Sequence, residues 1–232
     1  MKEQRDKPEF DSLADGYYEQ HKSNIAITGE GPEFFAEYKI KDFAELFLES
    51  GFPKYVLDFG SGIGNSLVPF RKYFSSSRLC CADVSERSLE IAKKKYPGNE
   101  KYIVIDRVIP SEDNVFDAVF TACVFHHIQT DMHRHWISEL YRVMKNGGML
   151  AVYEHNPFNP LTVHAVNTCP LDVNAHLIKA GEMRRLCEEC GWRNVRIEYK
   201  MFFPHLLESL RFLEKYLTKC CWGAQWRLTA VT

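Results

Sequence analysis

The stretch Val56-Leu57-Asp58-Phe59-Gly60-Ser61-Gly62-Ile63-Gly64-Asn65 decides the fold of this chain. An apolar run ends near an acidic residue, and three glycines alternate behind it. This pattern is typical of a buried strand that turns tightly into a loop, because glycine carries no Cβ. Such a loop lets backbone N–H groups approach a nucleotide-like cofactor. A dinucleotide loop of the G-x-G-x-x-G type would place its third glycine at position 65, so the asparagine there argues against NAD.

A second acidic residue follows the next predicted strand. The apolar run Leu79-Cys80-Cys81-Ala82 ends at Asp83-Val84, and Ser85 is predicted to cap a helix over residues 86–95. A carboxylate at the tip of the second strand can accept hydrogen bonds from both hydroxyls of a ribose. The chain thus carries a strand, a glycine loop, a helix, a second strand and an acidic residue in this order. That order predicts a cofactor site more strongly than the glycines alone.

The D-x-G-x-G-x-G pattern at 58–64 resembles motif I of the class I S-adenosylmethionine-dependent methyltransferases, especially the small-molecule members of the ubiquinone-biosynthesis type. The likeness continues through residues 102–107 as the third strand, 113–120 as the fourth, and Thr121-Ala122-Cys123-Val124-Phe125-His126-His127-Ile128 as the segment after it. It implies an α/β fold, a three-layer Rossmann-like sandwich with a mostly parallel seven-stranded sheet and an antiparallel edge strand. It also implies S-adenosyl-L-methionine as the cofactor.

The resemblance assigns residues to that cofactor. Asp106 would contact the adenine amino group, although Arg107 departs from the family pattern and places a long cation beside that site. Tyr17 and Tyr18 lie in an N-terminal arm that in relatives folds over the cofactor, where a tyrosine ring attracts a sulfonium cation. Packing of the arm on the first helix is the alternative. The expected cofactor-binding residues are Tyr18, Asp58, Gly60, Ser61, Gly62, Gly64, Asp83, Val84, Asp106, Arg107 and Ala122.

Three histidines follow the predicted fourth and fifth strands, where the pocket of an open α/β sheet lies. His126 and His127 come after the fourth strand, and His155 comes after the fifth. Imidazole titrates near neutrality, so His127 and His155 are the candidate general bases for an acceptor hydroxyl. An amine or carbanion acceptor needs less help. For the double histidine, packing or lining of the cofactor pocket is the alternative.

The segment Glu154-His155-Asn156-Pro157-Phe158-Asn159-Pro160 combines two prolines with two asparagines. The prolines stiffen the loop, while the amides of Asn156 and Asn159 offer both donors and acceptors. That composition suits a polyhydroxyl or amide substrate, so these two are the candidate substrate-binding residues. An ordinary asparagine-proline turn series is the alternative.

No metal site is expected from the sequence. Cys187 and Cys190 have the spacing of half a zinc site, but they lie in a predicted helix with no second pair. His133 and His135 follow the double histidine closely, yet they fall at the polar start of another predicted helix.

Length and composition predict one globular domain over residues 1–232, which the resemblance implies is a methyltransferase domain. Its expected parts are an arm and helix at 1–50, a cofactor-binding core at 51–155, and a substrate-side half at 156–232 with an insertion near 201–222. The chain is 45% hydrophobic and 13% aromatic, enough for one large core. The charged opening predicts no secretory leader, so the eight cysteines are expected to be reduced in a cytoplasmic protein. A net charge of -2 disfavours a nucleic-acid partner, and no apolar run is long enough to cross a bilayer.

Further elements are expected outside the core: an irregular first part up to about residue 32, helices over 33–49 and 183–190, and strands over 195–199 and 225–231, the last at the sheet edge. Residues 201–222 resemble an insertion whose helix carries a leucine stripe, from Leu206 to Leu217. Such a stripe usually serves the core or a dimer contact. An apolar pocket or a membrane-surface contact, shaped with Trp222 or Trp226, is the alternative, and the protein is expected to be a monomer or a homodimer.

The sequence therefore predicts an S-adenosylmethionine-dependent methyltransferase with a small-molecule acceptor, with a sugar or lipid-linked saccharide preferred because of the asparagine-rich loop. One rival is a protein that binds S-adenosylmethionine without transfer activity. The other is an NAD-type Rossmann enzyme, against which Asn65 argues.

Overall fold

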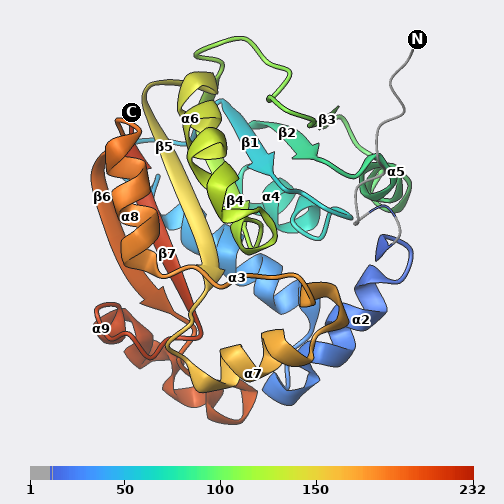
Figure 1. Ribbon diagram of the computed structural model, residues 1–232, viewed down its shortest axis with the longest axis vertical. Coiled ribbons are helices and arrows are strands. Elements are labelled where there is room, and N and C mark those ends of the chain that lie inside the picture. Colours follow the sequence, from blue (N-terminus) through green and yellow to red (C-terminus); the bar gives the residue numbers. More distant parts are fainter. Residues whose placement is uncertain (1–10, 12) are drawn as a thin grey trace.

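A seven-stranded sheet crosses the computed structural model, which describes residue 11 and residues 13–232 (Figure 1). Its order is β3-β2-β1-β4-β5-β7-β6, in which β1 to β5 run parallel and β7 is antiparallel to both of its neighbours. The strands are β1 (Tyr55–Phe59), β2 (Arg78–Asp83), β3 (Lys101–Val104), β4 (Phe116–Ala122), β5 (Met144–His155), β6 (Arg193–Lys200) and β7 (Gln225–Val231). The expected mostly parallel α/β sheet is confirmed.

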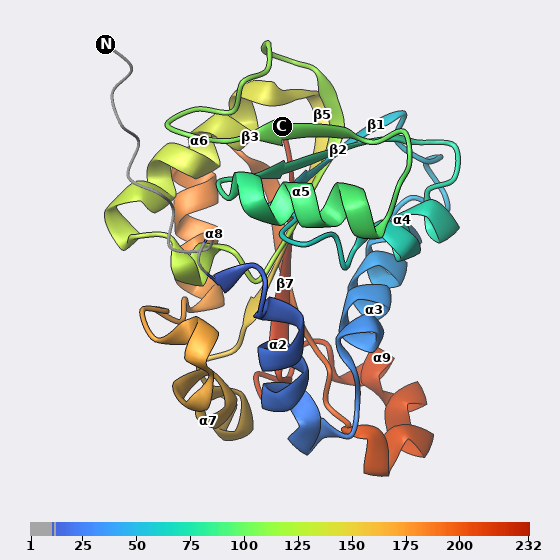
Figure 2. The same cartoon turned by 90° about the vertical axis from the view of Figure 1, so that its right-hand side faces the viewer.

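Helices cover both faces of this sheet (Figure 2). On one face lie α3 (Pro32–Glu45), α4 (Leu67–Tyr73) and α5 (Glu86–Lys95), and on the other lie α6 (His133–Val143) and α8 (Ala180–Glu189). The first face is aromatic, because side chains of α3 and α4 meet those of β4 in a cluster of Phe43, Phe47, Phe70, Phe74 and Phe120. The second face buries mainly aliphatic side chains, together with Trp136, Trp192 and Trp226.

Short elements lie beyond the carboxyl ends of the central strands (Figure 1). They are α2 (Tyr17–Ile25) with its extension η1 (Ala26–Thr28), η2 (Phe125–His127), η3 (Thr130–Met132), α7 (Pro160–Thr168) and η4 (Pro170–Asp172). Helix α2 packs against α3, α7 and η4, so a segment from the first part of the chain meets residues 160–172 over this side of the sheet. Within the described part of the chain, no helix combines the length and apolar character needed to cross a membrane.

Three elements differ from the expectation. The arm is helical over 17–28, and a helix, α7, follows the asparagine loop because Asn159 caps it and Pro160 occupies its first position. Strand β7 is antiparallel as expected but lies one position inside the edge, because β6 pairs with its outer side. The expected leucine helix is a kinked segment, η5 (His205–Leu213), followed by α9 (Glu214–Leu217). Its Leu206 is 91% exposed, and Trp226 is buried in the core instead.

Candidate functional site

The glycine loop after β1 places its three predicted glycines in three different surroundings. All three have a positive φ, between 51° and 83°, which L side chains rarely adopt. A Cβ on Gly60 would collide with Val124, and one on Gly64 would collide with Leu67. A Cβ on Gly62 would meet no atom within 4 Å, because that glycine faces open space. Gly60 and Gly62 therefore border the site, while Gly64 allows close packing beneath it.

The carboxylate of Asp83 is fixed at the tip of β2 by backbone donors. It accepts hydrogen bonds from the Gly62 N–H at 2.7 Å and the Ser85 N–H at 2.9 Å. Burial raises the pKa of Asp83, and these two N–H groups oppose that rise. The residue borders a cavity of about 140 Å³ whose other walls are largely apolar, including Val84, Ile105, Val124, Ile128 and Trp136.

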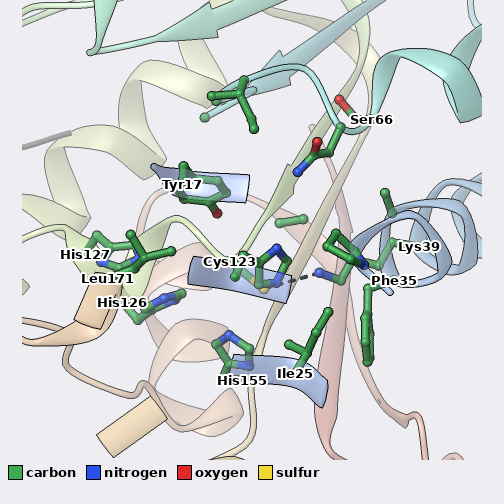
Figure 3. Close-up of a pocket in the computed structure, with 18 of the residues that line it drawn as sticks. Tyr17, Ile25, Phe35, Lys39, Ser66, Cys123, His126, His127, His155 and Leu171 are labelled. Atoms are coloured by element: carbon green, nitrogen blue, oxygen red, sulfur yellow. Dashed lines mark hydrogen bonds between the residues drawn. The ribbon is translucent and has the colours of Figure 1, made fainter. Parts of the chain in front are cut away.

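A second cavity, of about 200 Å³, lies on the other side of the glycine loop (Figure 3). Asp58 borders it, is only 2% exposed and accepts a hydrogen bond from the Ser66 hydroxyl at 2.5 Å. Burial raises the pKa of Asp58 to about 7, although the Ser66 bond works in the opposite direction. The predicted residues Ser61 and Ala122 line the same cavity. The buried Ser61 hydroxyl has no hydrogen-bond partner among the residues that the structure describes.

The two cavities share a common wall, which makes them two chambers of one elongated site. The shared residues are Tyr17, Gly60, Gly62, Ile63, Cys123 and His127. Figure 3 shows Tyr17, from α2, lying over this wall opposite Cys123. The 140 Å³ chamber offers an acid between apolar walls, which suits a ribose carrying an aromatic base. The 200 Å³ chamber offers polar and ionisable groups. The residues present thus fit an elongated cofactor with a nucleoside at one end.

Several predicted cofactor residues lie away from both chambers. The hydroxyl of Tyr18 donates to Glu33 at 2.8 Å at the surface, because the helical turn of α2 directs Tyr17, rather than its neighbour, toward the site. Asp106 and Arg107 are exposed, and neither lines a chamber. The residue from that strand end which does line the nucleoside-sized chamber is Ile105.

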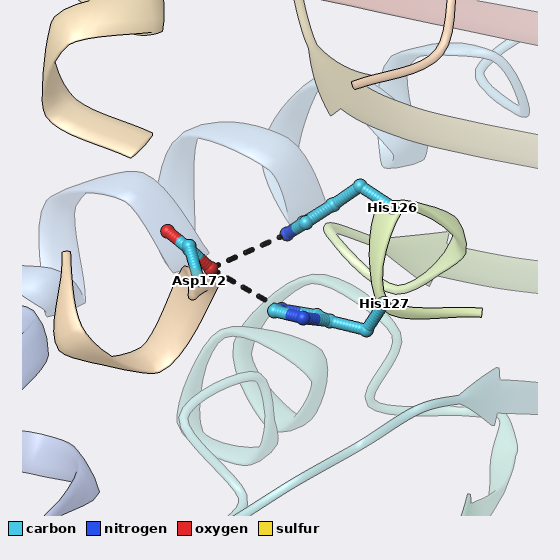
Figure 4. Close-up of side chains that lie close together, drawn as sticks. All are labelled: His126, His127 and Asp172. Atoms are coloured by element: carbon cyan, nitrogen blue, oxygen red, sulfur yellow. Dashed lines mark ion pairs between the residues drawn. The ribbon is translucent and has the colours of Figure 1, made fainter. Parts of the chain in front are cut away.

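The predicted histidines belong to a buried polar network in the larger chamber. Glu154 accepts hydrogen bonds from two backbone N–H groups and lies 2.6 Å from Nδ1 of His126. Burial opposes charge on His126, but the carboxylate of Glu154 overcomes it and raises the imidazole pKa to about 10. Asp172, from η4, lies 3.6 Å from Nε2 of His126 and 3.4 Å from Nε2 of His127 (Figure 4). The ring centroid of His155 lies 5.0 Å from that of His126.

His126 and His127 have opposite protonation tendencies. Burial and the neighbouring imidazole of His126 lower the pKa of His127 to about 4, so His127 is neutral near pH 7. A neutral imidazole can accept a proton. His127 borders both chambers and His155 borders the larger one, so the structure brings both candidate bases to the site.

Cys123 is a site residue that the sequence reasoning missed. Its Sγ lies 3.3 Å from Nζ of Lys39 and 3.6 Å from Nε2 of Gln225, and its φ is 57°. Burial raises the thiol pKa, but interactions with the side chains of His155 and Lys39 outweigh burial and lower it to about 6. No local pattern reveals this cluster, because its members come from α3, β7 and the ends of β4 and β5.

The two predicted substrate-binding asparagines have structural roles. The amide of Asn156 donates to the backbone carbonyls of Cys221 and Gly223, and its oxygen accepts from the Phe158 N–H. The amide oxygen of Asn159 accepts from the N–H of Thr162, two positions into α7, and its nitrogen donates to a backbone carbonyl. Neither residue lines a chamber, because the backbone of the loop before β7 occupies both amides.

Comparisons with known proteins agree with this geometry. Residues 57–152 match the family model described as a methyltransferase domain. The chain is 30% identical over 117 residues to a demethylmenaquinone methyltransferase of Thermus thermophilus, which covers 49% of this chain and 52% of that protein. It is 25% identical over 117 residues to the tRNA N(3)-methylcytidine methyltransferase Mettl2 of Drosophila melanogaster, covering 46% of this chain and 36% of that protein.

Solved structures show the same fold. A SAM-dependent methyltransferase from Archaeoglobus fulgidus superposes with a TM-score of 0.67 at 16% identity, over 87% of this chain and 95% of that one. The curated relatives named above match over about half of their length or less. Family match and fold together confirm the resemblance to class I methyltransferases that the sequence predicts.

Proposed function

We propose that this chain, which carries a methyltransferase domain of the class I fold, binds S-adenosyl-L-methionine and transfers its methyl group to a small-molecule acceptor. The observation that carries the proposal is the pair of chambers joined at the glycine loop, with Asp83 in one and the histidines in the other. The name of the demethylmenaquinone methyltransferase relative supports methyl transfer to a small-molecule acceptor.

The chambers suggest which residues hold each part of the cofactor. Asp83 is the ribose acceptor, and the apolar walls around Ile105 and Trp136 receive the adenine. The free space at Gly62 and the unpartnered hydroxyl of Ser61 lie where the methionyl part would pass into the larger chamber. When bound, the cofactor supplies an activated methyl on a sulfonium, so the protein needs mainly to align the acceptor and to exclude water.

The chain's own residues perform that alignment. Tyr17 belongs to the wall that both chambers share, and α2, α7 and η4 supply part of the lining of the larger chamber. For a hydroxyl acceptor, His127 or His155 takes the proton, and the lowered pKa of His127 keeps it in the neutral form that this role requires. The lowered pKa of the Cys123 thiol would give the wall shared by the two chambers a negative charge, which suits a cationic cofactor.

The volume of the larger chamber, about 200 Å³, supports a small acceptor. A sugar or lipid-linked saccharide remains within this class, but the asparagine loop no longer favours it, because both amides bind backbone. The Drosophila relative acts on tRNA by its name, while the net charge of -2 gives this chain no general attraction for phosphates.

Calorimetric titration with S-adenosylmethionine, S-adenosylhomocysteine and NAD tests the cofactor without knowledge of the acceptor. We expect binding of the two sulfur compounds and none of NAD. Binding of NAD alone, or of no compound, would refute the proposal. Binding followed by no transfer to any acceptor in a broad screen would favour the rival function of a binding protein without activity.

Substitutions at the glycine loop and at Asp83 sharpen the test. Gly62→Leu should abolish binding of S-adenosylhomocysteine, because its side chain would fill the free space in the site. Gly147→Leu is the matched control, since Gly147 also has a positive φ and open space around its missing Cβ but lies outside both chambers.

Asp83→Ala should weaken binding by about 1.5–3 kcal/mol, the value of a lost charged hydrogen bond. Unchanged affinity in both site variants would place the cofactor elsewhere.

A further inference from the structure

We propose that His126, His127 and Asp172 form a binding site for one divalent transition-metal ion, with Zn²⁺ as the first choice (Figure 4). The three side chains come from η2 and η4, which meet at the larger chamber. The site itself stands on the geometry below, whereas its role toward an acceptor rests on the proposed function.

The spacing of the donor atoms suits a shared ion better than direct hydrogen bonds. One oxygen of Asp172 lies 3.6 Å from Nε2 of His126 and 3.4 Å from Nε2 of His127, and all three donor atoms lie within 4.8 Å of one another. Hydrogen bonds between nitrogen and oxygen are shorter, at about 2.7–3.2 Å. Tetrahedral zinc with bonds of about 2.0–2.2 Å holds neighbouring ligands roughly 3.4 Å apart. The separations of Asp172 from the two imidazole nitrogens are close to that value.

Glu154 orients His126 for this role. Its carboxylate lies 2.6 Å from Nδ1 of His126 and is itself held by the N–H groups of Val124 and Phe125. With Nδ1 held by Glu154, Nε2 of His126 faces the carboxylate of Asp172, and a bound ion would take the place of the proton on that nitrogen. Carboxylate–histidine–metal arrangements of this kind are the usual second layer of zinc sites.

The donor set also limits which ion fits. Two imidazoles and one carboxylate suit zinc, iron, cobalt and nickel, whereas magnesium and calcium prefer oxygen donors alone. All three residues line the larger chamber, so a remaining coordination position would be reached from it. There the ion would hold an oxygen of the acceptor. In that arrangement His127 is a ligand, and His155 alone remains as the candidate base.

The expectation of no metal from the sequence arose because Asp172 lies far along the chain from the double histidine. The neighbouring histidines of the sequence cluster have other partners. His133 contacts the backbone carbonyls of Phe125 and Ile128, and His135 contacts that of Arg107. In the tertiary structure the residue that joins His126 and His127 is Asp172, and not His133 or His135.

Metal titration tests this site without cofactor or acceptor. The purified full chain is stripped with a chelator and titrated with Zn²⁺ by calorimetry and with Co²⁺ by visible absorption, which reports tetrahedral coordination. We expect one ion per chain and a Co²⁺ spectrum of a nitrogen and oxygen site. Asp172→Ala should weaken binding by at least about 100-fold, and Glu154→Gln by about 10 to 100-fold.

A matched control alters a second group of candidate ligands found in the part of the chain that the structure describes. Glu30, His205 and Glu208 also bring donor atoms together, but at the surface. His205→Ala should leave the tight binding unchanged, and cooperative thermal unfolding checks that each variant folds. Absence of tight binding by the wild-type chain, or equal binding by wild type and Asp172→Ala, would overturn the proposal. Because S-adenosylhomocysteine affinity is measured separately, normal cofactor binding combined with no tight metal binding would overturn only the metal site and leave the proposed function standing.

Discussion

Burial controls the charge of Asp58, a residue that the motif requires to be acidic. Its side chain is almost fully enclosed at the end of β1, and its one strong donor is the Ser66 hydroxyl. Because burial raises the pKa of this carboxyl to about 7, from an ordinary value of 3.8, the folded chain binds the proton more tightly than the unfolded chain does. Stability from this group is therefore present at low pH and is lost as the pH rises through about 7.

Asp58→Asn should remove that pH dependence. An amide oxygen can still accept the Ser66 bond but carries no charge, so the variant should gain stability relative to wild type as the pH rises. Each unit of pKa shift corresponds to about 1.4 kcal/mol, so the advantage should grow by about 2 kcal/mol between pH 5 and pH 8. Urea unfolding of both chains at the two pH values measures it. The exposed Asp131→Asn is the control, and a difference that does not change with pH would contradict the pKa assignment.

At the scale of elements, helix α7 depends on one capping side chain. Asn159 accepts from the Thr162 N–H, and its amide nitrogen ties α7 to the carbonyl of Trp222 before β7. The helix has only nine residues, too few to be stable without such contacts. Asn159 therefore positions α7, the helix that contributes Ala165 and Val166 to the lining of the larger chamber.

Asn159→Ala should lower the free energy of unfolding by about 1–2 kcal/mol, the usual effect of a lost cap. Asn159→Asp should retain most of the stability, because its carboxylate still accepts at the helix start. Neither change should affect S-adenosylhomocysteine affinity, since the residue lies outside both chambers. Equal unfolding free energies for wild type and Asn159→Ala would show that the cap is dispensable, and would return Asn159 to the candidates for acceptor binding.

At the scale of the whole molecule, a buried ionic network ties the antiparallel part of the sheet to α3. Asp42 accepts from the Tyr153 hydroxyl of β5 at 2.7 Å and from Arg227 of β7 at 2.6 Å, and it pairs with Lys200 of β6 at 2.9 Å. Three strands and one helix thus share a single carboxylate. The network joins residues near both ends of the chain, so unfolding of the last two strands is expected to be coupled to the parallel core.

Asp42→Ala should destabilise the chain by about 3 kcal/mol, because it leaves buried cationic groups with fewer partners. The loss should be visible in denaturant unfolding as a lower midpoint, together with a single transition for all probes. Glu45→Ala, an exposed acid at the end of the same helix, should change stability by no more than about 0.5 kcal/mol. Equal effects of the two substitutions would show that the network adds nothing to stability.

The sequence by itself determined the parallel core of this protein and the cofactor-side loop. The Ser85 cap acts through a neighbour in the chain, the Ser88 N–H, while Gly62 donates to Asp83 because the ends of β1 and β2 lie side by side. The α/β class, the methyltransferase resemblance and the helix over 86–95 follow from these patterns. They could be predicted because strand ends in a parallel sheet meet at one edge.

Only the tertiary structure decided the acceptor side. Tyr17 faces the chambers instead of Tyr18 because α2 is a helix packed on α3, α7 and η4. The pairing of the double histidine with Asp172 and the contact of Lys39 with Cys123 join residues that share no periodicity in the sequence. Conversely, Asn156 and Asn159 have donors and acceptors that suit a ligand, but the backbone near β7 occupies them. Residue type shows what a side chain can bind, and long-range packing decides which partner it reaches.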